Sequence, residues 1–142
     1  MKVYADPSLI VSAFTDEVSS AAARAWLGSL SADRLLFSKW CETEIASALA
    51  GKVRIGVLAA ERRAAVIQGI RDNLHSAATL IHVGAAAFDR ATQLLENSQR
   101  PLRGGDALHL AIAERAGAAL YTLDRRMAEA GAALGLGAHL LT

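Results

Sequence analysis

The sequence predicts an α/β fold in which a parallel β-sheet lies between two layers of helices, a three-layer α/β/α domain. Short apolar runs with strand character alternate with longer stretches of helical spacing, which is the pattern of a parallel sheet covered on both faces. The 142 residues are 53% apolar and 20% charged, which suits one hydrophobic core and excludes a disordered chain. We therefore expect a single domain over residues 1–142.

Five segments are predicted as strands, because each is short, apolar and bounded by polar or turn-forming residues. In chain order they are Lys2–Ala5, Leu35–Ser38, Thr79–Val83, Ala119–Thr122 and Ala138–Leu141. Six longer segments carry helix-forming residues at helical spacing. They are Ser19–Leu30, Trp40–Ala50, Leu58–Leu74, Ala85–Glu96, Ala107–Ala116 and Arg126–Leu134. The third is the clearest amphipathic helix, since its apolar residues form one stripe and its charged residues lie largely off it.

Charge and composition exclude several classes of protein. Fifteen basic residues against fourteen acidic ones give a net charge of +1, so any site for a polyanion must be local. One cysteine and two prolines exclude a disulfide framework and a cysteine-rich zinc module. The amino terminus reaches Asp6 and Pro7 too early for a signal peptide, and no apolar run is long enough for a membrane helix. We therefore expect a cytoplasmic protein.

Four acidic residues follow strands or stand near the helices after them. Asp6 follows the first predicted strand, and Asp124 follows the fourth. Asp106 begins a helix after Gly104 and Gly105, and Glu44 lies one turn into the helix after the second strand. Because parallel strands all end at one edge of the sheet, these carboxylates are expected to converge there.

Converging carboxylates repel one another, and a hard divalent cation resolves the conflict. Oxygen ligands without accompanying cysteine or a histidine pair favour Mg²⁺ or Mn²⁺ over zinc. Each aspartate also has a simpler interpretation, because Asp6, Asp106 and Asp124 each suit the N-cap of a helix. Glu44 fits capping less well, since it stands inside its helix beside apolar positions.

Four sequence segments resemble a known family. They are Tyr4-Ala5-Asp6-Pro7-Ser8, Thr43-Glu44-Ile45-Ala46-Ser47-Ala48-Leu49, Asp106-Ala107-Leu108-His109-Leu110-Ala111 and Tyr121-Thr122-Leu123-Asp124. In order, spacing and total length they resemble the PIN-domain ribonucleases, especially the VapC toxins of bacterial toxin–antitoxin pairs. The resemblance implies a central five-stranded parallel sheet, with Asp6, Glu44, Asp106 and Asp124 as metal-binding acids. It also implies Mg²⁺-dependent RNA cleavage, a cognate antitoxin and a homodimer.

Several further residues are candidates for supporting roles. Ser8 is predicted to orient Asp6 or to bond a free amide of the first helical turn, and Thr122 to hydrogen-bond a carboxylate or simply to pack in its strand. A packing role is favoured for His109 over that of a general base. Trp26 and Trp40 are assigned to packing rather than base stacking. Four arginines flank two of the acids and are candidates for contacts with RNA phosphates: Arg100, Arg103, Arg125 and Arg126.

The resulting hypothesis is a PIN-type endoribonuclease in which the four acids hold Mg²⁺, with Mn²⁺ as a substitute, and which leaves 5′-phosphate and 3′-hydroxyl ends. One alternative is a non-catalytic PIN scaffold that acts by binding protein or RNA. The other is a phosphotransfer or phosphatase domain. It is disfavoured because Asp6-Pro7-Ser8 lacks the second aspartate of an Asp-x-Asp pair, and no lysine follows a late strand. The chain also has no phosphate-binding glycine-rich motif.

Overall fold

The computed structural model describes all residues 1–142, and its elements alternate much as the sequence predicts. The strands are β1 (Val3–Ala5), β2 (Leu35–Ser38), β3 (Thr79–Ile81), β4 (Ala119–Thr122) and β5 (Ala138–Leu140). The helices are α1 (Pro7–Phe14), α2 (Ser20–Gly28), α3 (Lys39–Arg54), α4 (Ala60–Ala77), α5 (Ala85–Asn97), α6 (Gly104–Arg115) and α7 (Arg125–Ala133). All strand pairings are parallel in the order β3-β2-β1-β4-β5, which confirms the predicted five-stranded sheet.

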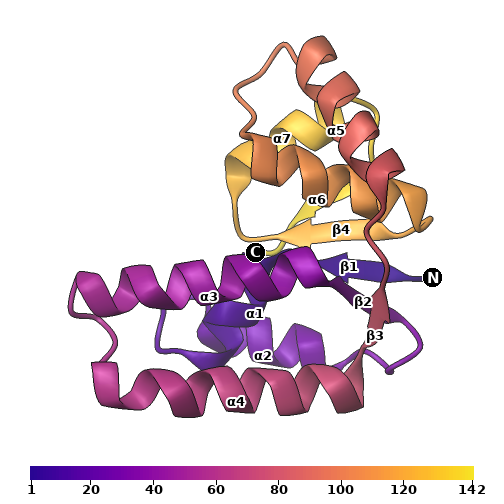
Figure 1. Ribbon diagram of the computed structural model, residues 1–142. Helices are drawn as coiled ribbons and strands as arrows, with labels where there is room; N and C mark the ends of the chain where they lie inside the picture. The colour runs from indigo at the N-terminus through magenta and orange to yellow at the C-terminus, as the bar shows by residue number, and fades with distance from the viewer.

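Helices lie on both sides of the sheet. In the view of Figure 1, α5, α6 and α7 lie above β4, whereas α1 and α2 lie below the sheet and α4 runs along the bottom. The long helix α3 lies beside α1 and α4, with which it shares contacts. This arrangement is the three-layer α/β/α architecture that the alternation of strands and helices predicts.

The helix α1 is the one element that the sequence prediction omits. The Asp6-Pro7 pair is correctly interpreted as its start, because Asp6 is the N-cap, its carboxylate accepts from the Ser8 amide, and Pro7 opens the first turn. The helix itself is buried on nearly every side, at six of its eight residues. It is a short apolar run of eight residues, and periodicity alone cannot distinguish such a run from a buried strand.

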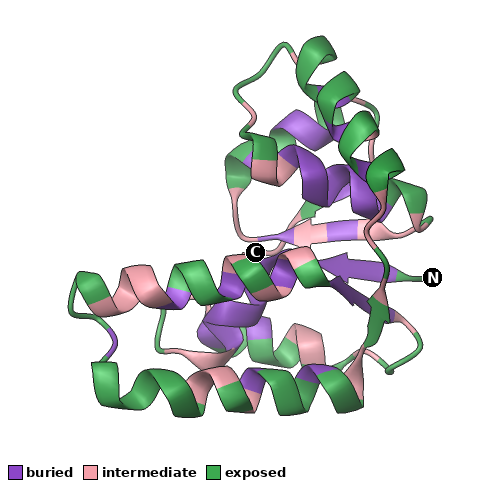
Figure 2. Cartoon of the chain, in the orientation of Figure 1, coloured by how far each residue is buried: buried purple, intermediate pink, exposed green.

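The hydrophobic core lies where the central strands meet the surrounding helices. Strands β1 and β2 are buried throughout, as is much of α6, whereas β3 at the edge and the outer face of α4 are exposed (Figure 2). Tyr4, Leu36 and Phe37 are among the largest fully buried side chains. The central strands are thus held rigidly, and so are the residues at their carboxyl ends.

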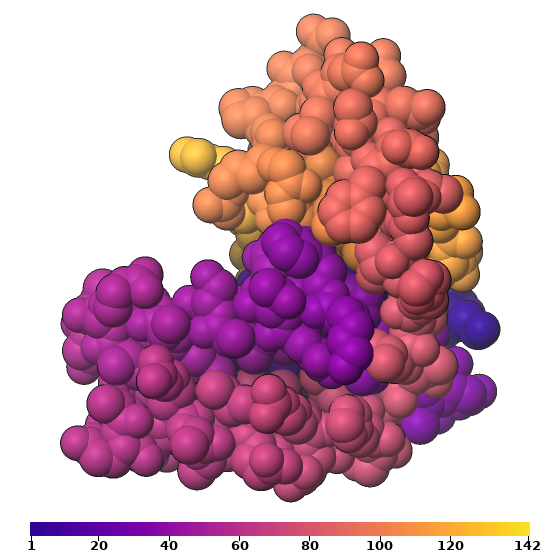
Figure 3. All heavy atoms as spheres, viewed as in Figure 1, coloured from indigo at the N-terminus to yellow at the C-terminus, as the bar shows by residue number.

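The order β2-β1-β4 places the point of topology reversal at the centre of the sheet. Ligands of open parallel sheets bind in the crevice beyond the strand ends at such a point. The paired α3 and α4 project to the left in the space-filling view, while the carboxyl-terminal half rises above them, so the outline has a re-entrant angle (Figure 3). The arrowheads of β1 and β4 point toward the same side of the molecule (Figure 1).

None of the helices combines the length and apolar character needed to cross a membrane.

The close packing of α7 generates a prediction about stability. A Cβ added at Gly131 would lie 2.6 Å from Cβ of Ala138 and 2.9 Å from Cδ2 of Leu110. We expect Gly131→Ala to lower the free energy of unfolding by about 1–3 kcal/mol, the usual cost of overpacking a core. The matched control is Gly69→Ala, since Gly69 lies inside α4 with open space around it. That substitution should stabilise the protein by about 0.5–1 kcal/mol. Urea denaturation measures both, and equal effects of the two substitutions would contradict the packing described here.

Candidate functional site

Asp6 lies at the carboxyl end of β1, and only one of its two carboxylate oxygens accepts hydrogen bonds from the protein. Its Oδ2 accepts hydrogen bonds from the Ser8 hydroxyl, the Ser8 amide at 3.2 Å and the Thr122 hydroxyl at 3.0 Å. Ser8 and Thr122 therefore contact Asp6, which is one of the two alternatives that the sequence left open for each residue. Both also accept hydrogen bonds, from the amides of Leu123 and Asp124 respectively, so the two loops are tied together. The Asp6 Oδ1 atom receives no hydrogen bond from the protein and is the oxygen available to a ligand.

The two carboxylate oxygens of Asp124 also have different partners. Its Oδ1 caps α7 by accepting from the amides of Arg126 at 2.9 Å and Met127 at 3.4 Å, as the capping interpretation predicted. Its Oδ2 lies 3.8 Å from Nη2 of Arg103. One carboxylate thus serves the helix and still presents an oxygen to the site.

The predicted capping role of Asp106 is wrong. Helix α6 begins at Gly104, earlier than the predicted start at Ala107, so Asp106 lies within its first turn. The N-cap position is Arg103, whose side chain makes no capping bond. The Asp106 carboxylate therefore remains free of capping bonds.

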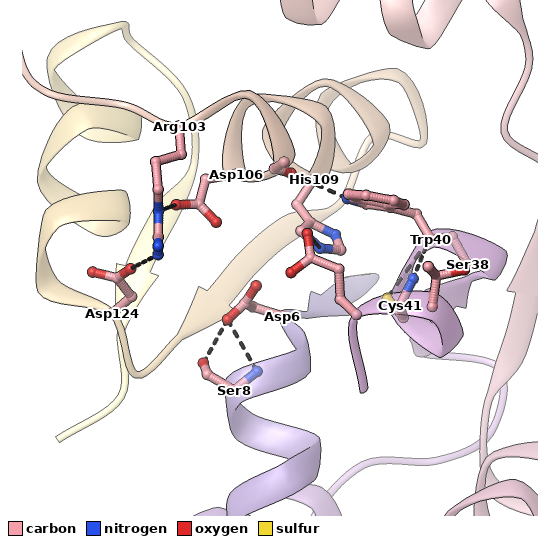
Figure 4. Close-up of polar contacts among 12 residues, drawn as sticks. Asp6, Ser8, Ser38, Trp40, Cys41, Arg103, Asp106, His109 and Asp124 are labelled. Atoms are coloured by element: carbon pink, nitrogen blue, oxygen red, sulfur yellow. Dashed lines mark hydrogen bonds and ion pairs between the residues drawn. The ribbon is translucent and has the colours of Figure 1, made fainter. Parts of the chain in front are cut away.

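Arg103 connects two of the acids. Its guanidinium lies 3.5 Å from Oδ2 of Asp106 and 3.8 Å from Oδ2 of Asp124, as the dashed lines of Figure 4 show. Its side chain is 84% exposed, so these ion pairs are weak and the side chain is free to leave. A surface cavity of about 530 Å³ adjoins them, lined by Arg103, Asp106, Asp124 and Arg126 among others.

Glu44 approaches the same edge from α3. Its Oε1 lies 3.6 Å from Nε2 of His109, an ion-pair distance longer than a hydrogen bond. This contact with His109 lowers the pKa of Glu44 despite its partial burial, and Arg103 contributes in the same direction. On its other side the Glu44 carboxylate lies close to the backbone of α6 at Gly105. A Cβ added at Gly105 would lie only 2.7 Å from Oε1 of Glu44. Gly105, the second glycine of the pair, therefore leaves room for the Glu44 carboxylate because it has no side chain.

The charges of the other three predicted acids act on Asp106. Burial raises the pKa of Asp106, the nearby Arg103 lowers it, and the charges of Asp6, Asp124 and Glu44 raise it further. No three acidic, histidine or cysteine side chains are grouped closely enough here to hold a metal ion, so the acids share a site without forming a closed cage. The donor set nevertheless suits a hard divalent cation, because it consists of carboxylates and Asp6 keeps an unbonded oxygen.

A buried polar network that sequence analysis missed lies behind Glu44. The Tyr4 hydroxyl lies 2.8 Å from the Ser38 hydroxyl, 3.1 Å from the Cys41 sulfur and 2.8 Å from Nδ1 of His109. Burial raises the pKa of Tyr4, so its phenol stays protonated. Burial disfavours a charge on His109, but contacts with Cys41 and Glu44 outweigh it and raise the pKa of His109 to about 10. His109 is fully buried, in agreement with its predicted packing role.

The remaining candidate residues are less closely connected to the acids. Arg126 lines the cavity with Arg103, whereas Arg100 pairs with Glu129 at 3.7 Å and Arg125 is exposed on α7. Trp40 packs 6.1 Å from the His109 ring and donates to the Gly105 carbonyl at 3.2 Å. Trp26 packs 5.0 Å from Tyr121. Both tryptophans therefore pack within the protein, as predicted.

Comparisons with known proteins agree with this architecture. The family model of the PIN domain matches residues 3–133. Solved structures that resemble the chain include VapC20 of Mycobacterium tuberculosis, a sarcin–ricin loop cleaving toxin, at 19% identity and a TM-score of 0.72, covering 95% of this chain and 96% of that one. A toxin–antitoxin complex from Klebsiella pneumoniae has 17% identity, a TM-score of 0.66 and coverage of 89% and 91%. VapBC2 of Rickettsia felis, bound to a DNA fragment from its promoter, has 15% identity, a TM-score of 0.69 and full coverage of both chains. No curated protein sequence matches the chain.

The raised pKa of Asp106 predicts a stability effect that depends on pH. Its folded-state pKa exceeds the ordinary value near 3.8, so ionisation of Asp106 opposes folding at neutral pH and ceases to do so once the group is protonated in both states. We expect Asp106→Asn to raise the melting temperature at pH 7 in EDTA, with the gain shrinking as the pH falls toward 4. Calorimetry measures this, with Asp89→Asn on the exposed face of α5 as the control. A lower melting temperature of Asp106→Asn at pH 7 would contradict the crowding of charges.

Proposed function

The chain belongs to the PIN domain family, and on that premise we propose that it is a divalent-cation-dependent endoribonuclease, the toxin of a toxin–antitoxin pair. The observation that carries the proposal is the placement of Asp6, Glu44, Asp106 and Asp124 at the carboxyl edge of the sheet, where burial and the charges of the other three raise the pKa of Asp106. Such a shared field attracts Mg²⁺ or Mn²⁺.

Different residues of the site have different roles in the proposed hydrolysis of RNA. A divalent ion held by the four carboxylates would neutralise the phosphodiester charge and lower the pKa of a water for in-line attack on phosphorus. Ser8 and Thr122 hold Asp6 so that Oδ1 points away from its hydrogen-bonded side. Arg103, exposed and weakly paired, moves from the acids to a phosphate of the RNA, and Arg126 lines the same cavity.

We also propose an antitoxin partner and a homodimer. The structural relatives include a toxin–antitoxin complex and VapBC2, which supports a protein partner for this chain. Exposed apolar side chains on α5, Phe88 and Leu95, lie two helical turns apart, and Leu80 of β3 is also exposed. Apolar surface of this kind favours association with a second chain. A cytoplasmic location, which the sequence favours, completes the proposal.

The direct test is Asp6→Asn. The substitution removes one charge and leaves the size of the side chain unchanged, so the fold should survive. We expect at least about a hundredfold loss of RNA cleavage, because even an outer partner of a metal ligand is typically worth 10–100-fold. Cleavage of a panel of structured RNAs is measured with Mg²⁺ or Mn²⁺ and with EDTA, and the products are checked for 5′-phosphate ends. Asp89→Asn serves as the matched control.

Two outcomes would reject the enzyme assignment. Undiminished cleavage by purified Asp6→Asn protein would place the active site elsewhere. Tight binding of a partner by the unaltered chain, without cleavage of any RNA in the panel, would favour the non-catalytic scaffold instead.

The glycine pair before Asp106 allows a second test. In Gly105→Ala the new methyl group meets the Glu44 carboxylate, whereas Gly104→Ala meets nothing within 4 Å. We expect Gly105→Ala to weaken Mn²⁺ binding by about tenfold or more. Its free energy of unfolding should change by less than about 1 kcal/mol, because the nearest atom is the end of a flexible side chain and the Trp40 ring, 3.3 Å from the added Cβ, has to move only slightly. Gly104→Ala should leave Mn²⁺ binding unchanged. Titration calorimetry and urea denaturation measure the two quantities, and equal Mn²⁺ affinities of the two variants would contradict a role for Glu44.

A further inference from the structure

His109 has an unusual environment on the side that faces the acids. Its ring is fully buried on α6, and its Nε2 is the one buried side-chain nitrogen or oxygen in the chain that has no hydrogen-bond partner. Leaving a buried donor unpaired typically costs about 1–3 kcal/mol. The nearest charged group is the Glu44 carboxylate, 3.6 Å away. The fold therefore retains a destabilising group that points at one specific acid.

The opposite side of the ring is fixed. Nδ1 lies 2.8 Å from the Tyr4 hydroxyl, which is itself held by Ser38 at 2.8 Å and Cys41 at 3.1 Å. Ser38 is the N-cap of α3 and Tyr4 is the central residue of β1, so these contacts anchor the ring to the most buried part of the sheet. The Tyr4 and Trp40 rings pack at 5.7 Å and 6.1 Å from the imidazole. Rotation of the ring would break these contacts, so Nε2 keeps its direction.

Glu44 needs such a partner more than the other acids do. Asp6 and Asp124 are held by two or more hydrogen bonds each, and both have short side chains. Glu44 has a longer side chain that is 32% exposed and accepts no hydrogen bond within the usual distance. A side chain of this kind loses considerable rotamer freedom when it is held in one place. Without an anchor it would extend into solvent.

We propose that His109 is a positioning residue, which holds the Glu44 carboxylate against Gly105 and toward Asp106 through its Nε2 atom. The proposal rests on the proposed function for its effect on ion binding. His109 does not contact RNA, because the ring is completely buried. It acts through Glu44, in the manner of the outer partners that orient the ligands of metal sites.

Two substitutions separate positioning from packing. In His109→Gln the carboxamide nitrogen can take the place of Nε2, so the donor toward Glu44 is kept and the contact with Tyr4 is lost. In His109→Asn the amide reaches only the place of Nδ1, so the contact with Tyr4 is kept and the donor toward Glu44 is lost. Both variants have a smaller side chain than the imidazole, and both should lower the melting temperature in EDTA to a similar extent.

The dissociation constant of Mn²⁺, measured by titration calorimetry, is the decisive quantity. We expect His109→Asn to weaken binding by about tenfold or more, and His109→Gln to stay within about threefold of the unaltered chain. In the background of Glu44→Gln the two His109 variants should bind Mn²⁺ equally, because the residue through which His109 acts is gone. Equal losses for Asn and Gln in the presence of Glu44, or no loss for either, would overturn the proposal and leave His109 as a packing residue.

A second measurement requires neither a metal ion nor a substitution of His109. Nitrogen-15 NMR of the chain in EDTA should show a proton on Nε2 of His109 that exchanges slowly with water, since the ring is buried. Glu44→Gln should shift this signal, whereas Asp89→Asn should not. A signal that is unaffected by Glu44→Gln would overturn the proposal. If the unaltered chain takes up no Mn²⁺, the proposed function fails, and the NMR result alone decides the positioning of Glu44.

Discussion

Electrostatic repulsion among four carboxylates is the constraint on which the arrangement of the site depends. Parallel strands end at one edge, so the topology brings Asp6 and Asp124 together whether or not their charges favour it. The protein does not remove the repulsion, since burial and the neighbouring charges raise the pKa of Asp106. It fixes the positions of Asp6 and Asp124 instead, through hydrogen bonds from hydroxyls and amides. The cation that we propose for this site would offset the repulsion that hydrogen bonds leave in place.

The capping and functional interpretations of the aspartates turn out to be compatible. Asp6 gives Oδ2 to Ser8 and Thr122 and keeps Oδ1 unbonded, and Asp124 gives Oδ1 to α7 and turns Oδ2 toward Arg103. A capping motif in the sequence describes only one oxygen of each carboxylate. The second oxygen is directed by the cap itself, because a carboxylate held through one atom has little freedom to turn the other. Helix capping therefore orients the carboxylate oxygens of the site.

The fold was largely predictable from the sequence, whereas the contacts within the site were not. Short apolar runs bounded by turn-forming residues identified every strand, and helical spacing identified six helices. The prediction missed α1 because that helix is a short, almost wholly buried apolar run. Order along the chain placed the four acids at one edge. The network of Tyr4, Ser38 and His109 joins residues up to 105 positions apart, and its existence depends on side-chain directions that no local pattern records. Gly105 is similar, because its role is the space it leaves for Glu44.

Several features that oppose folding are concentrated around the same sheet edge. They include the crowded charge of Asp106, the unpaired Nε2 of His109 and a pair of glycines in the first turn of α6. Each feature lowers stability, and none is needed by an α/β fold as such. Features of this kind persist in natural proteins chiefly where function requires them, while the rest of the chain compensates. Here the compensation comes from β1 and β2, which are buried throughout, and from α6, in which seven of twelve residues are buried. Asp6 directly follows β1, and Asp106 lies in α6. The site therefore depends on the core, because only firmly held elements can keep like charges close together.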